Sequence, residues 1–390
     1  MVQAIKTFIM NHVGRTAVLP GTRSHPSDGP DTRWSSNMRR RRLLAATAAA
    51  ATVIVSGWAA LTTPLASAEA DRPLAAPAGS PVAVNGALSV CGVNLCNEAG
   101  EAIQLRGMSS HGIQFFPNCL NAASLDALRN DWKADFVRIA MYVQEGGFET
   151  DPAGFTAKVN QAVEQATALG LYAIIDFHIL TPGDPNFNLA RARSFFADVA
   201  AEHAGKNNVI YEVANEPNGV SWDDIKSYAE QVIPVIRAAS PDSVVLVGTR
   251  GFSSLGVSEG GNETEVIEDP VDAANIMYTF HFYAASHKDF QRETVARAAK
   301  SLPLFVSEFG TQTFTGDGAN DLQSATTWLD LLKSLKIGYS MWSFSDGGES
   351  NSVFTRGACA GTDFAGTDVL TESGEFIRSR ILSSAAVAED

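Results

Sequence analysis

Eight short apolar runs recur along this chain, and helical patterns separate most of them. Each run covers eight to ten residues, which is too short for a typical helix. Each is also too continuously apolar for a strand with one exposed face, so the pattern predicts parallel strands buried on both faces. The runs span residues 103–112, 135–142, 171–180, 208–217, 243–251, 275–283, 302–310 and 337–346.

The segments between the runs read as amphipathic helices, most clearly at 152–170 and 222–240. The second begins after Ser221, a good N-cap, and carries Asp223 and Asp224 in its first turn. Eight strands that alternate with helices predict the α/β class and a single-domain (β/α)8 TIM barrel. A doubly wound open sheet is the alternative, but it would usually show a Gly-rich phosphate loop after its first strand.

The N-terminal part has the composition of an export signal. Arg39–Arg42 precede a long apolar stretch, and Ala66-Ser67-Ala68 follows as a cleavage-like site. We therefore expect a signal peptide at 38–68 and a secreted, extracellular protein. A membrane anchor is the alternative, and the Arg-Arg pattern leaves both the general secretory and the twin-arginine route open. Residues 1–37 have no role in this scheme, so we expect a non-native or disordered extension there and translation from residue 38.

The charge of the remaining chain is strongly acidic. The whole chain has a formal net charge of −14, and residues 1–68 hold eight basic and two acidic residues, which leaves −20 from Glu69 onward. Such a surface argues against nucleic-acid and anionic-membrane partners and suits a neutral one. We expect an Ala/Pro-rich lead-in at 69–85, one catalytic domain at 86–390, no membrane association after signal removal, and a monomer.

Four cysteines lie in this mature part, and an even number in an exported chain indicates two disulfides with three possible pairings. Cys91 and Cys96 flank a plausible hairpin, "GVNL", so we expect them to pair. That leaves Cys119 with Cys359. Zinc is the alternative, but no Cys-x-x-Cys motif or nearby His supports it.

Polar and aromatic residues stand at the end of nearly every apolar run. In a barrel, the C-terminal ends of the strands meet at one face, where active sites lie. We therefore expect these side chains to gather there. They are His111, Arg138, Tyr142, His178, Asn215, Glu216, His281, Tyr283, Glu308 and Trp342.

Two of these residues are carboxylates on the fourth and seventh runs, Glu216 and Glu308. Paired carboxylates that face each other are the minimum for cleaving a glycosidic bond, because one protonates the leaving oxygen and the other attacks the anomeric carbon. Arg138 would keep the nucleophile ionised through a charge-assisted pair. The alternative is that these residues have only structural roles. Arg138 would then belong to an ordinary buried ion pair, and His178 and His281 would be core residues whose ring nitrogens are hydrogen-bonded.

A metal site is a further alternative, with His178 and His281 joined by Asp176 and Glu308. We disfavour it, because "DFHIL" is not a His-x-His pair and Arg138 would repel a metal cation. We therefore expect no metal and no cofactor.

Six motifs together carry a family resemblance. The stretches "GMSSHGIQFF", "VRIAMYVQE", "DFHILTPGDPN", "YEVANEPNG", "HFYAASH" and "SEFG" resemble glycoside hydrolase family 5, in its bacterial endoglucanase branch. The similarity runs from about Cys91 to Arg380, and the motifs occur in the family's order at the expected strand ends. The resemblance implies a retaining β-1,4-glucanase.

The resemblance also implies roles for individual residues. Glu216 matches the family's acid/base, and Glu308 matches its nucleophile. Arg138 and Tyr283 match residues that position the nucleophile, and Asn215 matches the amide that binds the 2-hydroxyl of the sugar. The matches that line the same sugar site are His111, His178 and His281, with Trp342 as the stacking platform.

The chain departs from the family mainly in aromatic positions. Relatives often have Trp where this chain has Phe115, Phe177 and Phe252, and Asn where it has Ser343. We expect Phe115 and Phe252 to bind outer sugars from loops at the C-terminal end of the barrel, and Tyr142, at the end of the second strand, to bind substrate as well. Phe177 should point toward the helices instead.

The sequence thus predicts a secreted endo-β-1,4-glucanase that cleaves β-1,4-glucan, a polysaccharide, by double displacement. The first alternative is a retaining hydrolase of another β-glycan, such as mannan, xyloglucan or mixed-linkage glucan. The second is an inactive glycan-binding barrel, which loss of either Glu216 or Glu308 would signal.

Overall fold

The computed structural model describes residues 76–385, which form a closed parallel barrel of eight strands. The predicted extension at 1–37 and the predicted signal at 38–68 lie outside the described residues. The order around the barrel is β10-β3-β4-β5-β6-β7-β8-β9, so strands that follow one another in sequence are neighbours in space. The strands are β3 Arg106–Ser110, β4 Phe136–Tyr142, β5 Tyr172–His178, β6 Val209–Glu212, β7 Val245–Val247, β8 Ile276–Tyr283, β9 Leu304–Gly310 and β10 Tyr339–Phe344.

The predicted barrel is confirmed, and each of the eight apolar runs contains one strand. The fourth run differs in its end, because β6 stops at Glu212. Beyond it the backbone N–H of Val213 donates to Leu246 of β7, whereas that of Asn215 donates to Phe177 of β5. In a regular strand, residues two apart point their N–H groups toward the same neighbour. The switch from β7 to β5 therefore ends the ladder, and Asn215 and Glu216 lie on a loop rather than on the strand.

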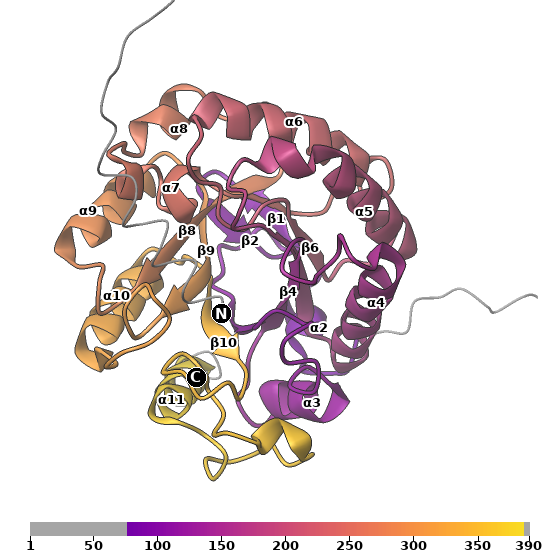
Figure 1. Cartoon of the computed structure of the whole chain (residues 1–390), viewed down its shortest axis with the longest axis vertical. Helices are drawn as coiled ribbons and strands as arrows, with labels where there is room; N and C mark the ends of the chain where they lie inside the picture. Colours follow the sequence, from indigo (N-terminus) through magenta and orange to yellow (C-terminus); the bar gives the residue numbers. More distant parts are fainter. Residues whose placement is uncertain (1–75, 386–390) are drawn as a thin grey trace, which may run out of the picture. The chain divides into compact units, whose positions relative to one another are not determined.

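Helices surround the barrel, as the view in Figure 1 shows. The predicted helix at 222–240 is α6, and Ser221 caps it by accepting from Asp224 N while the Asp224 side chain accepts from Ser221 N. The short 3₁₀ helices are η1 Pro185–Asn188, η2 Val257–Glu259 and η3 Ala358–Ala360. The α-helices after the barrel has begun are α3 Ala122–Asn130, α4 Pro152–Leu169, α5 Leu189–Glu202, α6 Trp222–Arg237, α7 Arg250–Ser253, α8 Thr264–Glu268, α9 Asp289–Ala298, α10 Leu322–Ser334 and α11 Glu372–Ala385.

The main hydrophobic core lies between the strands and these helices. Phe177 of β5 is fully buried there and packs against Phe195 and Phe196 of α5, with ring centroids 5.7 and 5.8 Å apart. The alternation of side chains along a strand explains this, because the neighbouring His178 then faces the barrel interior. Phe177 is thus a core residue, as the sequence predicts, and does not reach a sugar.

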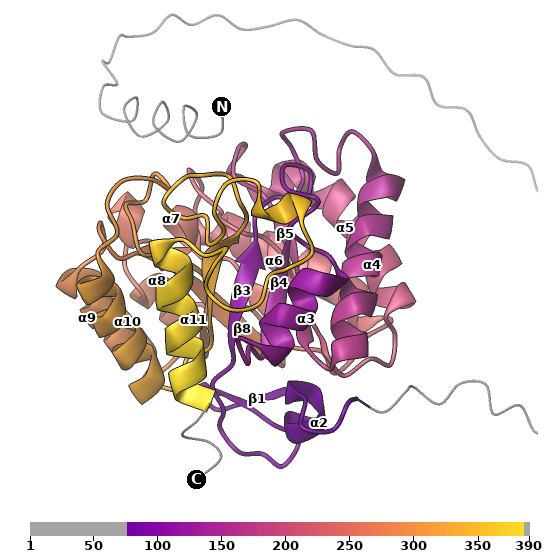
Figure 2. The ribbon, with the colours of Figure 1, turned by 90° about the horizontal axis from the view of Figure 1, so that it is seen from below.

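A small N-terminal unit lies against the start of the strands (Figure 2). It consists of α2 (Pro81–Asn85) and an antiparallel hairpin of β1 (Ser89–Cys91) and β2 (Asn94–Cys96), which the predicted Cys91–Cys96 disulfide closes. Its apolar side chains share a second core with the first inward-facing residues of the strands, so this end of the barrel is filled. The members are Val82, Leu88, Leu95, Leu105, Phe136, Tyr172, Ile174, Ile210, Val244, Leu246, Met277 and Phe305.

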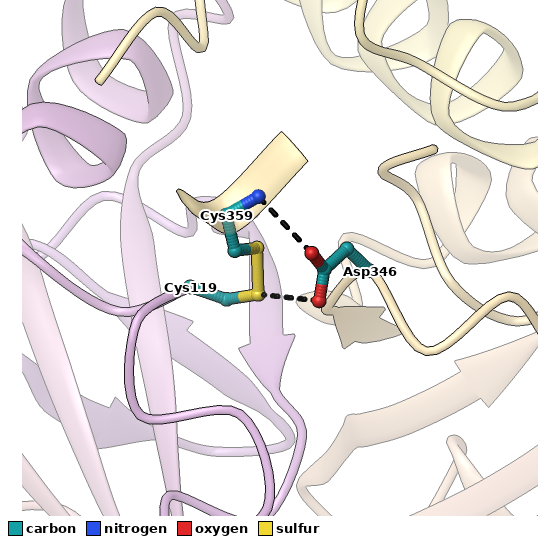
Figure 3. A group of neighbouring side chains, drawn as sticks. All are labelled: Cys119, Asp346 and Cys359. Carbon is teal, nitrogen blue, oxygen red and sulfur yellow. Dashed lines mark hydrogen bonds between the residues drawn. A yellow bond between two sulfur atoms is a disulfide. The ribbon is translucent and has the colours of Figure 1, made fainter. Parts of the chain in front are cut away.

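The predicted Cys119–Cys359 disulfide joins the loop after β3 to the loop after β10 (Figure 3). Asp346 lies beside it and accepts from the backbone N–H groups of Gly357 and Cys359 at 3.1 Å. The bond therefore connects two C-terminal loops that lie 240 residues apart in sequence. Within residues 76–385, no helix combines the length and the apolar character that a membrane span requires.

Candidate active site

The two predicted carboxylates meet at the C-terminal end of the barrel. Glu216 comes from the loop after β6 and Glu308 from β9, and the two residues are only 3% and 2% exposed. One oxygen of each carboxylate and one ring nitrogen of His281 all lie within 4.8 Å of one another. Retaining glycosidases hold their two carboxyl groups about 5–5.5 Å apart and inverting ones about 6.5–9.5 Å, so this spacing matches the retaining arrangement.

Two donors orient the Glu308 carboxylate. The Tyr283 hydroxyl donates to Oε1 at 2.5 Å, and Arg138 Nη1 donates to Oε2 at 3.4 Å. Burial, followed by the nearby charge of Glu308, raises the pKa of the Tyr283 phenol well above 10. Tyr283 therefore stays protonated and keeps donating to Glu308 at neutral pH.

Arg138 binds Glu212 more closely than Glu308. Its Nε lies 2.7 Å from Glu212 Oε2 and its Nη2 lies 3.2 Å from Oε1, whereas the contact with Glu308 is 3.4 Å. Burial opposes the charge of Arg138, but Asp176, Glu212 and Glu308 together keep its pKa above the ordinary value. The guanidinium is thus the permanent centre of a buried cluster of three carboxylates rather than the dedicated partner of Glu308.

Sequence reasoning missed Glu212. The residue lies inside an apolar run and faces the barrel interior, two positions after the inward-facing Ile210. A lone carboxylate on the inner face of a buried strand was the available signal, because such a charge must be paired.

Asp176 and His178 form a second buried pair, with Asp176 Oδ2 2.7 Å from His178 Nδ1. Burial, followed by the nearby Arg138, lowers the pKa of His178 to about 3, so the ring is neutral at pH 7. Burial raises the pKa of Asp176 to about 7, although Arg138 at 3.0 Å acts in the opposite direction. His178 Nδ1–H then donates to Asp176, which leaves Nε2 as an acceptor for Asn215 Nδ2 at 3.2 Å.

Asn215 is held on both sides of its amide. Its Oδ1 accepts from Arg138 Nη2 at 2.6 Å, and its Nδ2 also donates to the carbonyl of Ile179 at 3.2 Å. The short contact fixes which end of the amide is oxygen. The two N–H contacts are long, so a sugar hydroxyl that enters the site would compete with His178 for the same hydrogen.

Aromatic rings line the side of the site next to β3, β4 and β10. Tyr142 stacks on His178 at 4.0 Å, and His178 stacks on Trp342 at 5.3 Å. His111 lies 4.8 Å from Trp342 and parallel to Tyr142. Trp342 is only 5% exposed, whereas Phe115, in edge contact with His111 and Tyr142, is 38% exposed. All the predicted sugar-binding rings on this side therefore adjoin one another, and Phe115 is the outermost of them.

Phe252 lies after β7 in the short segment α7, whose backbone is not helical at Gly251 and Phe252. Gly251, Phe252 and Ser253 all have left-handed backbones, with φ of 71, 63 and 53°. In this conformation Phe252 N donates to the carbonyl of Pro217, and Ser253 Oγ donates to that of Asn215. The strained turn thus fixes both sides of Glu216, and this is a second feature that the sequence analysis missed.

The arrangement also bears on the metal alternative. Among the described residues, two donor sets are closely spaced: Glu216, His281 and Glu308, and Asp346 with the disulfide-bonded Cys119 and Cys359. Neither contains the Asp176 and His178 that the sequence suggested. Arg138 holds a fixed positive charge 3.4 Å from Glu308, and this charge would oppose a second cation beside the same carboxylate.

We expect a Phe→Trp substitution at position 115 or 252 to lower KM on soluble cellulose derivatives by up to about tenfold. A larger aromatic face would add ~1 kcal/mol of stacking energy, and 1.4 kcal/mol corresponds to one decade. The kcat should stay nearly constant, because an outer sugar is bound equally in the ground and transition states. Steady-state kinetics measures both constants, and a changed kcat at constant KM would place that Phe in the catalytic subsite instead.

We also expect stability to fall as pH drops below about 6.5, partly through His287. Its Nδ1 accepts from the backbone N–H of Tyr283 at 2.9 Å, so protonation breaks this bond. Burial, together with the neighbouring Lys288, lowers the pKa of His287 to about 4. The unfolded state therefore binds more protons between pH 4 and 6.5, and the free energy of unfolding should lose about 1.5 kcal/mol from this group between pH 6.5 and 5.

Gln can accept the same hydrogen bond and does not titrate, so His287→Gln should lose correspondingly less stability over this pH range. Urea unfolding of both proteins at pH 6.5 and 5 measures the difference. Equal losses in the two proteins would exclude His287 as a source.

The sequence and the fold both match known proteins. Residues 96–348 match the model of the family described as Cellulase (glycosyl hydrolase family 5). Endoglucanase CelA of Streptomyces lividans is 63% identical over 303 residues, and endoglucanase E-5 of Thermobifida fusca is 56% identical over 306 residues; each match covers 78% of this chain and 66% of the relative. The chain thus spans about two thirds of the length of these relatives.

A solved structure extends the match to the fold. The crystal structure of the catalytic domain of Thermobifida fusca endoglucanase Cel5A (E5) is 56% identical, with a TM-score of 0.77 over 78% of this chain and 100% of that one. The match covers the whole of that catalytic domain, and the identity is far above the level at which only the fold is shared. The chain belongs to glycosyl hydrolase family 5, the cellulase family.

Proposed function

We propose that the protein is an endo-β-1,4-glucanase that cleaves internal bonds of β-1,4-glucan with retention of anomeric configuration. The observation that carries the proposal is the approach of Glu216 and Glu308 to within 4.8 Å. With one oxygen of each carboxylate this close, the spacing is nearer to the roughly 5–5.5 Å of retaining enzymes than to the roughly 6.5–9.5 Å of inverting ones.

In the first step, a Glu308 oxygen attacks the anomeric carbon while the bond to the leaving oxygen breaks. Glu216 gives its proton to that oxygen, and a glycosyl ester forms on Glu308. In the second step, Glu216 takes a proton from water as the water attacks the same carbon, and the ester bond breaks. Both carboxyl groups then return to their initial states, with the acid proton back on Glu216.

The surrounding residues support this division of roles. Arg138 and Tyr283 both donate hydrogen bonds to Glu308, and these hold its carboxylate in position to attack. Glu216 instead contacts Nδ1 of His281, at 3.1 Å. The carboxylate with the two donors suits the nucleophile, and the other suits the acid/base.

The names of the relatives, which are endoglucanases, favour glucan as the substrate. The catalytic domain of the Thermobifida fusca enzyme has also been solved in complex with cellotetraose. Because the outer aromatic positions differ from the pattern expected for the family, mannan, xyloglucan or mixed-linkage glucan remains the second candidate. Reducing-end release from a panel of these soluble polysaccharides, with the Glu308→Gln variant as the blank, distinguishes them.

We expect the first sugar released from a soluble cello-oligosaccharide to be the β anomer. Double displacement inverts the anomeric carbon twice, so the product keeps the configuration of the bond that was cleaved. Proton NMR within the first minutes, before mutarotation, records the ratio of the anomers. An initial α product would contradict the retaining mechanism.

The proposal includes export as a soluble monomer. The basic, apolar and small-residue segments of 38–68, the acidic chain that follows and the two disulfides all suit a secreted protein. N-terminal sequencing and size-exclusion chromatography of protein from the culture medium test cleavage after Ala68 and the monomeric state.

A further inference from the structure

A chain of three side chains leads from the acid/base candidate to the floor of the site. His281 Nδ1 lies 3.1 Å from Glu216 Oε1, and His281 Nε2 lies 2.9 Å from Ser307 Oγ. Ser307 Oγ in turn lies 2.7 Å from Glu212 Oε1. We call Glu212, Ser307 and His281 the relay. All three residues are buried, and none was assigned to this arrangement by the sequence analysis.

The hydrogen count of Ser307 fixes the direction of every bond in the relay. A serine hydroxyl has one hydrogen, and a carboxylate paired with a guanidinium only accepts. Glu212 makes that pair with Arg138 through both oxygens, so Ser307 must donate to Glu212. The same hydroxyl then accepts at its other contact, so His281 Nε2 carries a hydrogen.

The tautomer of His281 follows from this. A neutral imidazole has one N–H, and if it is on Nε2, then Nδ1 is a bare acceptor. That bare nitrogen faces Glu216 Oε1, where it can only accept a hydrogen from the protonated carboxyl group. The opposite tautomer would place an N–H against Glu216 and stabilise its ionised form, which is the wrong form for the first step.

We propose that Ser307 and Glu212 are positioning residues that hold His281 in the Nε2–H tautomer, so that Glu216 stands ready as an acid. This inference rests on the role proposed above for Glu216. Neither residue touches the reacting atoms. They act through His281, and they affect the step in which Glu216 donates its proton to the leaving oxygen. The attack by Glu308 does not depend on them.

The selective effect separates this role from a merely structural one. Hydrolysis of cellotetraose, whose leaving group is a sugar hydroxyl, needs the proton of Glu216, whereas the dinitrophenolate of 2,4-dinitrophenyl cellobioside departs without it. General acid catalysis contributes about 10²–10⁴-fold, and a misdirected tautomer should forfeit part of that. We expect Ser307→Ala to lower kcat/KM for the poor leaving group at least about tenfold more than for the good one.

Two variants serve as controls. Ser307→Thr keeps the hydroxyl and should restore the wild-type ratio of the two substrates. Ser340→Ala removes an equally buried hydroxyl that donates to the backbone carbonyl of Ser307, outside the relay, and should leave the ratio unchanged. Equal losses on both substrates in Ser307→Ala, no loss on either, or no rescue by Thr would each overturn the proposal.

A spectroscopic test needs neither a variant nor turnover. In protein labelled with ¹⁵N-histidine, and with His281 assigned, neutral His281 should show a protonated Nε2 and an unprotonated Nδ1. The reverse pattern would overturn the relay even if Ser307→Ala failed to fold. Failure of the wild type to hydrolyse either glycoside would instead refute the proposed function and leave the tautomer measurement valid.

Discussion

We expect Glu308→Gln to abolish hydrolysis of every substrate, whereas Glu216→Gln should fail only where a proton is needed. Gln at position 308 has no nucleophilic oxygen for the ester, so leaving-group quality cannot compensate. With Gln at position 216, an activated aryl cellobioside still glycosylates Glu308, and cellulose-type substrates slow by about 10²–10⁴-fold. The ester should then accumulate, because no base remains to activate water.

Stopped-flow measurement of aryl alcohol release from the Glu216→Gln protein should show a burst of one equivalent, and intact mass spectrometry should show the added glycosyl group. Azide needs no general base and should speed the second step. If Glu308→Gln shows the burst and Glu216→Gln does not, the two roles are reversed.

The second large effect should come from the Cys119–Cys359 disulfide. It closes a loop of 240 residues, for which the chain-entropy description gives about 5 kcal/mol, and measured effects are usually somewhat smaller. Replacing both cysteines by Ser should therefore lower the free energy of unfolding by about 3–5 kcal/mol and Tm by about 5–8 °C. Urea unfolding and calorimetry measure the two quantities.

The Cys91–Cys96 disulfide provides the matched control, because its cysteines are only 5 residues apart. Replacing that pair by Ser should cost about 2 kcal/mol on the same description. Comparable losses for the two double variants would show that loop length does not determine the stabilisation here.

The barrel was predictable because its signal is local. A run such as 171–180 shows by itself that it is buried on both sides, and eight such runs separated by helices allow few architectures. The carboxylate pair was predictable for a related reason, because all strands of the barrel point the same way. Once Glu216 and Glu308 are placed toward the C-terminal ends of the fourth and seventh apolar runs, the topology brings both to the C-terminal end of the barrel.

The relay was not predictable in this way. Glu212 and Ser307 are 95 residues apart and belong to strands that are not neighbours in the barrel. Their contact depends on which strand positions face inward at the same depth, and hydrophobic patterns do not specify this. The loop after β7 shows the same limit. The hydrogen bond from Phe252 N to Pro217 requires a left-handed backbone at Phe252, and a Phe at that position does not predict such a backbone from the sequence.

The filled N-terminal end of the barrel has a practical consequence. The unit of α2, β1 and β2 lies there, and Arg106, the first residue of β3, contacts the carbonyl of Ile381 in α11 through its Nη1. The described chain therefore enters and leaves at the end of the barrel opposite Glu216 and Glu308. Fusion tags, tethers or solid supports joined directly at residue 76 or residue 385 would attach to the closed base, and an immobilised catalyst built in this way would keep its working face turned toward the polymer.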